Sequence, residues 1–148
     1  MTNKVSNNKK GFTIIEVVLV LAVAALIFLI VFLAVPALQR SRRDTARKND
    51  VGRAIAQLES YASSHNGEYP SNVANFNLFK VDFLDNFADP GKGSYTVVGT
   101  TPAAEGQLQY QRNGKCDANN KIVSGGGTRY VAISVKLEQG GTYCKGNK

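Results

Sequence analysis

A single carboxylate, Glu16, lies at the start of a long apolar run, where its type and position suggest a chemical role. The run from Val17 to Leu38 contains 22 residues and no charge, and a helix that crosses a membrane needs about 20. A charged side chain costs about 2.5 to 3.5 kcal/mol at the centre of a bilayer, so an acid in such a segment is usually paired or functional. We therefore expect a membrane-spanning helix and a cationic partner for Glu16. The alternative is an interfacial acid that the positive end of the helix dipole favours.

Two cysteines, Cys116 and Cys144, are the next candidates for chemistry. The 27 residues between them match neither a CxxC redox pair nor a zinc-site spacing. We interpret them as a disulfide in an oxidising compartment, which would stabilise the fold by about 3 to 4 kcal/mol. The alternative is two free buried thiols in a cytosolic domain.

Other reactive side chains are few. The single histidine, His65, lies beside the turn sequence NGEYP, where a capping or surface role is usual. Asp117, Asn119 and Asn120 have the oxygen ligands that calcium prefers, but turn chemistry explains them equally well. We expect no catalytic residue, no cofactor and no metal.

The net charge of +7 is unevenly distributed. Residues 54–91 carry −4 and residues 92–148 carry +5, a polarity that permits head-to-tail packing between copies. The basic residues near the C-terminus could hold the phosphates of DNA, although solubility explains them as well. They are Arg112, Lys115, Lys121, Arg129, Lys136, Lys145 and Lys148.

The elements that must position these residues begin with a basic, polar leader, residues 1–11. An ordinary secretory signal is the alternative. In such a signal a polar segment with the cleavage site follows a short apolar region, but here the apolar run continues through that position. Six basic residues between Arg40 and Arg53 outnumber the three lysines of the leader, and positive-inside counting would leave the N-terminus outside. The cysteines and the Gly-rich C-terminal region favour the opposite topology, with the C-terminus outside, and we adopt it.

A continuous helix is predicted over residues 12–64. Pro36 lacks the N–H that would bond to the Phe32 carbonyl and should kink this helix. An apolar stripe at helical spacing indicates one buried face beyond the membrane: Val51, Ile55, Leu58 and Ala62. Gly67 and Pro70 end the helix.

The segment 71–93 has Phe76, Phe79, Phe83 and Phe87 at spacings of three and four. It is either a short helix or an ordered loop with aromatic anchors. Residues 94–98, 108–112 and 129–138 read as strands of an antiparallel meander. In the last, an apolar face should pack on the helix: Val131, Ile133, Val135 and Leu137.

The N-terminal sequence KKGFTIIEVVLVLAV, with Gly11, Phe12 and Glu16 before an apolar helix, closely resembles the class III signal of type IV prepilins. The resemblance implies an α+β, pilin-like fold, in which a long helix packs on a small antiparallel sheet and a disulfide closes the C-terminal loop. It also implies that a prepilin peptidase cuts between Gly11 and Phe12 and methylates the new amine. Glu16 of an incoming subunit would then attract the ammonium group of a Phe12 already in the filament.

The implied function is that of a pilus subunit and not an enzyme. Residues 1–11 would be the leader, 12–40 the membrane and filament-core helix, and 41–148 the extracytoplasmic domain. The partners would be other copies, the peptidase, the membrane and its pilus assembly platform, with adhesion, motility or DNA uptake as the role of the surface filament. One alternative is a pseudopilin of a secretion or competence system. Another is a single-pass anchored domain that binds a ligand outside the membrane.

Overall fold

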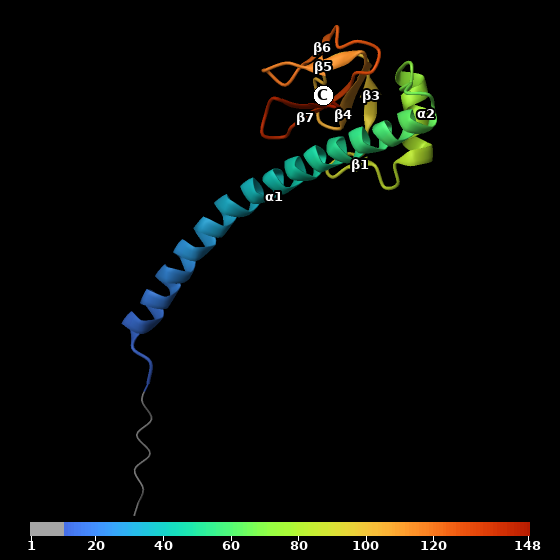
Figure 1. Ribbon diagram of the computed structural model, residues 1–148. Helices are drawn as coiled ribbons and strands as arrows, with labels where there is room; N and C mark the ends of the chain where they lie inside the picture. Colours follow the sequence, from blue (N-terminus) through green and yellow to red (C-terminus); the bar gives the residue numbers. More distant parts are fainter. Residues whose placement is uncertain (1–10) are drawn as a thin grey trace, which may run out of the picture. The chain divides into compact units, whose positions relative to one another are not determined.

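The computed structural model describes residues 11–148, and its first element is a long helix, α1 (Ile14–Ser64), shown in Figure 1. The predicted leader lies outside the described residues except for Gly11. The chain divides after Leu38 into two units. The first contains the apolar part of α1, and the second contains the rest of α1 and all the other helices and strands.

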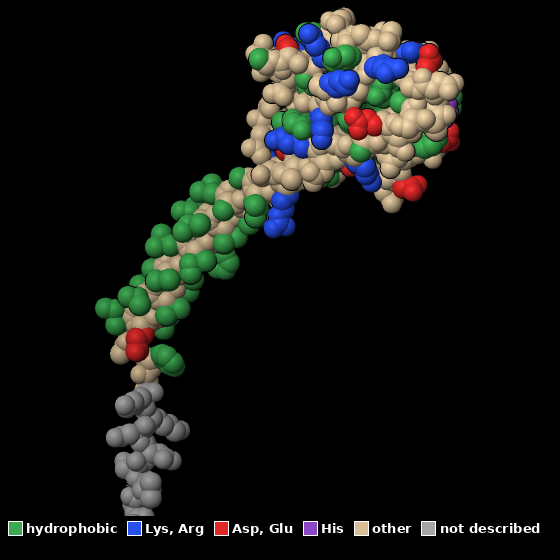
Figure 2. Space-filling model, viewed as in Figure 1, with side chains coloured by type: hydrophobic (Ala, Val, Ile, Leu, Met, Phe, Trp, Pro, Cys, Tyr) green, Lys and Arg blue, Asp and Glu red, His purple; other side chains and the backbone are tan. Residues whose placement is uncertain are grey.

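The apolar part of α1 exposes its side chains along its length, as Figure 2 shows. Phe12 and Phe32, for example, are 89% and 77% exposed. Within residues 11–148, α1 is the one helix long and apolar enough to cross a membrane. It continues through Pro36, and the kink expected there stays a prediction. A surface this apolar indicates contact with lipid or with other apolar helices.

The second part of α1 buries one face, as its periodicity predicts. The four residues of the stripe are at most 5% exposed: Val51, Ile55, Leu58 and Ala62. Beyond the last helical residue, Gly67 has a φ of 81°, and its N–H donates to the Ala62 carbonyl at 2.7 Å. Glycine adopts this left-handed conformation without strain, and the bond satisfies a carbonyl that the helix end leaves free. The predicted helix end is confirmed.

The Phe-rich segment forms a helix followed by an anchored loop, so both interpretations of it hold in part. The helix is α2 (Val73–Phe83), and the Asn72 side chain caps it by accepting a backbone N–H. Phe76 and Phe79 are buried in the core beside α1. Phe87 lies beyond the helix and is also buried, so it anchors the loop.

Four strands form the main sheet, in the order β3-β4-β7-β8. Their bounds are β3 (Thr96–Val98), β4 (Gln107–Arg112), β7 (Val131–Lys136) and β8 (Thr142–Gly146). The last three pair antiparallel, and the sheet contributes with α1 to one core. The predicted α+β fold is therefore confirmed. β3 pairs parallel with β4, however, so the antiparallel meander is wrong for its first strand.

The connection between β3 and β4 explains the parallel pairing. Residues 99–106 return the chain so that Thr96 lies opposite Gln107. The Gln107 Oε1 atom accepts the N–H groups of Ala103 and Ala104 at 2.9 and 3.2 Å and holds this loop. Alternation of polar and apolar residues fixes which face of a strand is buried but not the direction of the strand.

Two short hairpins were not predicted from the sequence. β1 (Ala88–Asp89) pairs with β2 (Gly93–Ser94), and β5 (Gly114–Cys116) pairs with β6 (Ile122–Ser124). The predicted strand 94–98 is thus divided, and Tyr95 is buried between β2 and β3. Strands of two or three residues are too short for an alternating pattern to indicate them.

β7 is buried on both faces. The residues of its predicted apolar face are buried in the core or packed against it: Val131, Ile133, Val135 and Leu137. Ala132 and Ser134, on the opposite face, are buried as well. Ser134 pairs with Cys144 of β8, and Cys144 forms the predicted disulfide with Cys116 of β5. Paired residues project to the same face, so the β5–β6 hairpin covers this second face.

Candidate functional site

The start of α1 is closed by reciprocal hydrogen bonds between Thr13 and Glu16. The Glu16 Oε2 atom accepts the backbone N–H of Thr13 at 2.9 Å and the Thr13 hydroxyl at 3.0 Å. In return, Thr13 Oγ1 accepts the backbone N–H of Glu16 at 3.3 Å. This is a capping box, in which a threonine and a glutamate three positions later satisfy N–H groups that the first turn leaves free.

Thr13 was not among the residues singled out from the sequence. The signal was present, because a Thr and a Glu three positions apart before an apolar run are a signature of a helix start. The capping box also gives Glu16 a role within its own chain. It fixes the carboxylate beside the N-terminal end of α1, where the helix dipole favours negative charge.

The capping box does not neutralise Glu16, because N–H and O–H donors carry no net charge. None of the ion pairs in residues 11–148 involves Glu16. The cationic partner that the sequence predicts is therefore not found among these residues, and it stays a prediction.

Gly11 and Phe12 lie just before α1, and both are exposed. A Cβ added at Gly11 would meet nothing within 4 Å, so the described fold does not itself require a glycine there. Phe12 and Glu16 line the same apolar groove along the first turns of α1, together with Val17 and Val20. The structure thus brings two predicted site residues, Phe12 and Glu16, to one side of the helix start.

A second cluster of charged residues surrounds Arg47, whose side chain is fully buried. Its Nε and Nη2 atoms donate to the two Asp89 oxygens at 2.6 and 3.0 Å. Its Nη1 atom donates to Asp44 Oδ1 at 2.8 Å and lies 3.6 Å from Glu138 Oε2. Arg47 therefore joins α1 to the β1 segment in the geometry that a guanidinium fork and a carboxylate prefer.

Asp44 and Arg43 extend this group to the end of β7. Asp44 accepts the backbone N–H groups of Glu138 and Gln139 at 2.8 and 3.1 Å. Arg43 donates to the Glu138 carboxylate through Nε at 2.7 Å and Nη2 at 2.6 Å. We call Arg43, Asp44, Arg47, Asp89 and Glu138 the Arg47 cluster.

Hydrogen bonds lower the pKa of the carboxyl groups in the Arg47 cluster. Burial by itself would raise the pKa of Asp44 and Asp89, because it disfavours the charged form. Arg47 and two backbone N–H donors to each carboxylate outweigh burial, so both pKa values lie below the usual value for Asp. The bond from Arg43 likewise lowers the pKa of Glu138.

The Arg47 cluster changes the interpretation of the basic segment after the apolar run. Arg43 and Arg47 bind acids 95 and 42 positions away in the sequence, and Arg53 pairs with Asp50 at 3.0 Å. Arg40 lies 3.7 Å from Glu138 as well, so four of the six basic side chains between residues 40 and 53 have an acidic partner in the folded domain. Only the Asp44–Arg47 and Asp50–Arg53 spacings of three residues were visible from the sequence.

The remaining candidate residues have structural contacts. His65 stacks on Tyr61 with ring centroids 3.8 Å apart, beyond the end of α1. Asp117 Oδ1 accepts the N–H groups of Asn119 and Lys121 at 2.9 and 2.8 Å, which closes the β5–β6 turn. Residues 11–148 contain no group of three or more His, Cys, Asp or Glu that could hold a metal.

Two of the basic residues considered for DNA have contacts within the domain. Lys and Arg side chains are scattered over the visible face of the domain in Figure 2, with acidic residues among them. Arg112 lies 3.6 Å from Glu68, and Lys148 lies over the Tyr130 ring at 5.7 Å. DNA binding stays a prediction.

Residues 6–32 match the family model described as the prokaryotic N-terminal methylation motif. No curated protein and no solved structure matches the chain. The match covers Lys9 and Lys10 before Gly11, the Thr13–Glu16 capping box and most of the apolar run. The chain carries the N-terminal methylation motif of a type IV pilin-like prepilin, joined to an α+β domain with a Cys116–Cys144 disulfide.

Proposed function

We propose that this chain is the subunit of a type IV pilus, cleaved after Gly11, N-methylated at Phe12 and polymerised into surface filaments. The observation that carries the proposal is the methylation motif on an exposed apolar helix that has the charged residue Glu16 in its first turn. The motif indicates a structural subunit and not an enzyme.

Cleavage supplies a positive charge that can pair with the Glu16 carboxylate. Gly11 and Phe12 precede α1, so a peptidase meets them outside the helix. Cutting between them converts the Phe12 amide nitrogen into an amine that is protonated at neutral pH. Two opposite charges that are each costly in hydrocarbon then offset one another when Glu16 of one subunit meets Phe12 of the next.

The capping box supports this pairing by holding the Glu16 carboxylate in one place. Both bonds from Thr13 go to Oε2, so Oε1 is available to a cation. The attraction is stronger in a partly buried site than in water, while desolvation limits the net gain. The main effect of this ion pair is therefore to set the axial register between subunits, and its contribution to stability is small.

The apolar part of α1 serves first as a membrane anchor and then as the filament core. Residues 12–40 would span the cytoplasmic membrane in the precursor, and residues 41–148 would lie outside it, where the disulfide is stable. The other partners would be the prepilin peptidase and the membrane platform that assembles the pilus. A pseudopilus subunit would carry the same motif, and the length of the filaments distinguishes the two.

Mass spectrometry of the protein recovered from the cell surface tests the proposal. A mature chain that starts at N-methylated Phe12 supports it. An intact leader on the surface protein contradicts it and favours an anchored domain that does not polymerise.

A further inference from the structure

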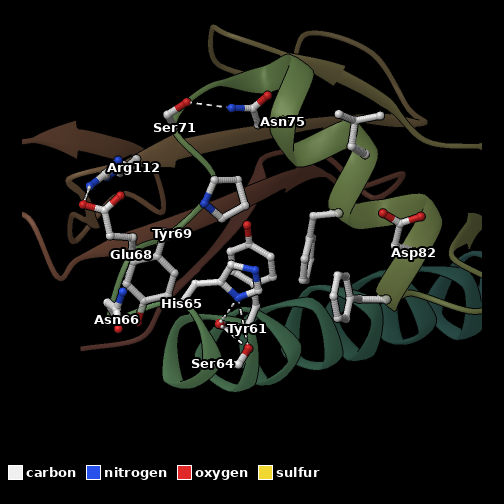
Figure 3. Close-up of a pocket in the computed structure, with 14 residues that line it drawn as sticks. Tyr61, Ser64, His65, Asn66, Glu68, Tyr69, Ser71, Asn75, Asp82 and Arg112 are labelled. Atoms are coloured by element: carbon white, nitrogen blue, oxygen red, sulfur yellow. Dashed lines mark hydrogen bonds and ion pairs between the residues drawn. The ribbon is translucent and has the colours of Figure 1, made fainter.

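The domain has an open groove that the proposed function does not use. It lies between the end of α1, the following loop and α2, and has a volume of about 690 Å³. Figure 3 shows it with the residues that line it. All of them belong to the unit formed by residues 39–148.

Aromatic rings form one wall of the groove. His65 lies parallel to Tyr61, with ring centroids 3.8 Å apart and an angle of 11° between the planes. Phe79 and Phe83 each meet Tyr61 edge-on at 5.5 Å. Phe79 is buried, whereas Phe83 is 44% exposed and His65 is also exposed. The wall therefore presents fixed, partly solvated rings.

Polar groups line the rest of the groove. Asn75 Nδ2 donates to Ser71 Oγ at 2.8 Å, and Arg112 lies 3.6 Å from Glu68, as Figure 3 shows. Asp82 projects from α2 and is exposed. None of the ion pairs within residues 11–148 involves Asp82. The groove thus offers hydroxyl, amide and carboxylate groups opposite its aromatic wall.

We propose that this groove binds a neutral oligosaccharide. A sugar ring has an apolar C–H face that packs on aromatic rings and hydroxyl groups at its edge that bond to carboxylates and amides. Two carboxylates against one guanidinium disfavour a phosphate or a nucleic acid. The many polar groups would lose hydrogen bonds to water under a wholly apolar ligand. The proposal does not depend on filament assembly.

The groove positions two side chains for this role. His65 supplies the exposed ring on which the sugar face packs, and its stacking on Tyr61 fixes the plane of that ring. Asp82, on the α2 side, accepts hydrogen bonds from hydroxyl groups at the edge of the ligand. The two residues come from different elements, so the ligand bridges the end of α1 and α2.

The test uses the full-length protein in lipid nanodiscs that contain no glycolipid and no sugar-based detergent. Chitotetraose, cellotetraose, maltotetraose and tetralysine are titrated separately, and binding is followed by saturation-transfer NMR. At least one saccharide should bind saturably. His65→Ala and Asp82→Asn should each weaken that binding about tenfold or more.

Two matched variants serve as controls. Asp85→Asn changes an exposed aspartate that does not line the groove, and it should leave binding unchanged. His65→Phe keeps a planar ring and should retain binding that His65→Ala loses. Unchanged thermal unfolding of all four variants excludes loss of the fold as the cause.

Three results would overturn the proposal. One is the absence of saturable binding by all three saccharides. Another is an equal effect of Asp82→Asn and Asp85→Asn, which would place the ligand elsewhere. The third is binding of tetralysine without binding of any saccharide, which would make the groove a site for a cationic peptide.

Discussion

Thr13 and Glu16 hydrogen-bond to one another in both directions at the first turn of α1, with the Thr13 N–H 2.9 Å from Glu16 Oε2. Glu16 therefore has two separable properties. Its oxygens cap a helix, which a neutral amide oxygen also does, and its negative charge has no ion-pair partner within residues 11–148. Substitutions can remove one property and retain the other.

Replacing Glu16 with Gln keeps an oxygen for the Thr13 N–H and removes the charge. We expect normal membrane insertion and peptidase processing but no assembled filaments. Thr13→Ala should do the reverse: it weakens the cap by about 0.5 to 2 kcal/mol but leaves the charge, so filaments should still form. Immunoblots of the membrane fraction and of sheared surface filaments measure both outcomes. Wild-type filament yield from Glu16→Gln would show that the charge is not needed.

Removing one partner of the buried Arg47–Asp89 pair should strongly destabilise the domain. Asp89→Asn leaves the buried guanidinium with an uncompensated part of its charge, and breaking such a pair typically costs about 3 to 5 kcal/mol. Urea unfolding of the full-length protein, followed by near-UV circular dichroism, measures the change. Asp85→Asn is the matched control, because Asp85 is exposed and outside the Arg47 cluster. Equal stability of the two variants would contradict the assigned role of Asp89.

The Arg47 cluster should make the domain sensitive to acid. The pKa values of Asp44 and Asp89 are lower in the folded protein than usual, so these groups contribute stability above the pKa of unfolded Asp, about 3.9. That contribution is lost as the pH falls through the folded values. Asp50 acts in the opposite sense, because burial raises its pKa. Protonation on acidification removes the free-energy cost of burying its negative charge.

Thermal unfolding measured between neutral pH and about pH 3 tests this balance. We expect the unfolding temperature to decrease as the pH drops below about 4. The decrease should be less steep in Asp89→Asn, which has lost one of the three cluster carboxyl groups with a lowered pKa. A midpoint that rises on acidification would mean that Asp50 outweighs the cluster.

The disulfide should contribute stability to the folded domain in addition to the hydrogen bonds of the sheet. Cys116 and Cys144 are 28 positions apart, and in the chain-entropy model closing such a loop stabilises the fold by about 3 to 4 kcal/mol. The double variant Cys116→Ser/Cys144→Ser should lower the urea midpoint accordingly and become insensitive to dithiothreitol. A wild-type protein whose midpoint does not move on reduction would contradict this role.

The sequence predicted those elements whose signals are local. The stripe ending at Ala62 and the glycine at position 67 specify a helix face and its end without any knowledge of the rest of the fold. The uncharged run from Val17 to Leu38 predicted the exposed apolar part of α1 for the same reason. The disulfide followed from having two cysteines and no competing chemistry for them.

The features that were missed depend on long-range contacts or on very short segments. A run of arginines normally indicates a solvated surface, and nothing near Arg47 reveals that Asp89 will meet it 42 positions later. The parallel direction of β3 is set by a loop that Gln107 holds through its side chain. The capping box is different, because its signal was local and was overlooked.

A density map of the assembled filament, resolved well enough to place side chains, tests the central claim most directly. It should place the N-methylated amine of Phe12 in one subunit within about 4 Å of the Glu16 carboxylate in its neighbour, the usual limit for an ion pair. A map in which these groups lie far apart, or in which Glu16 binds the amine of its own chain, would contradict the account.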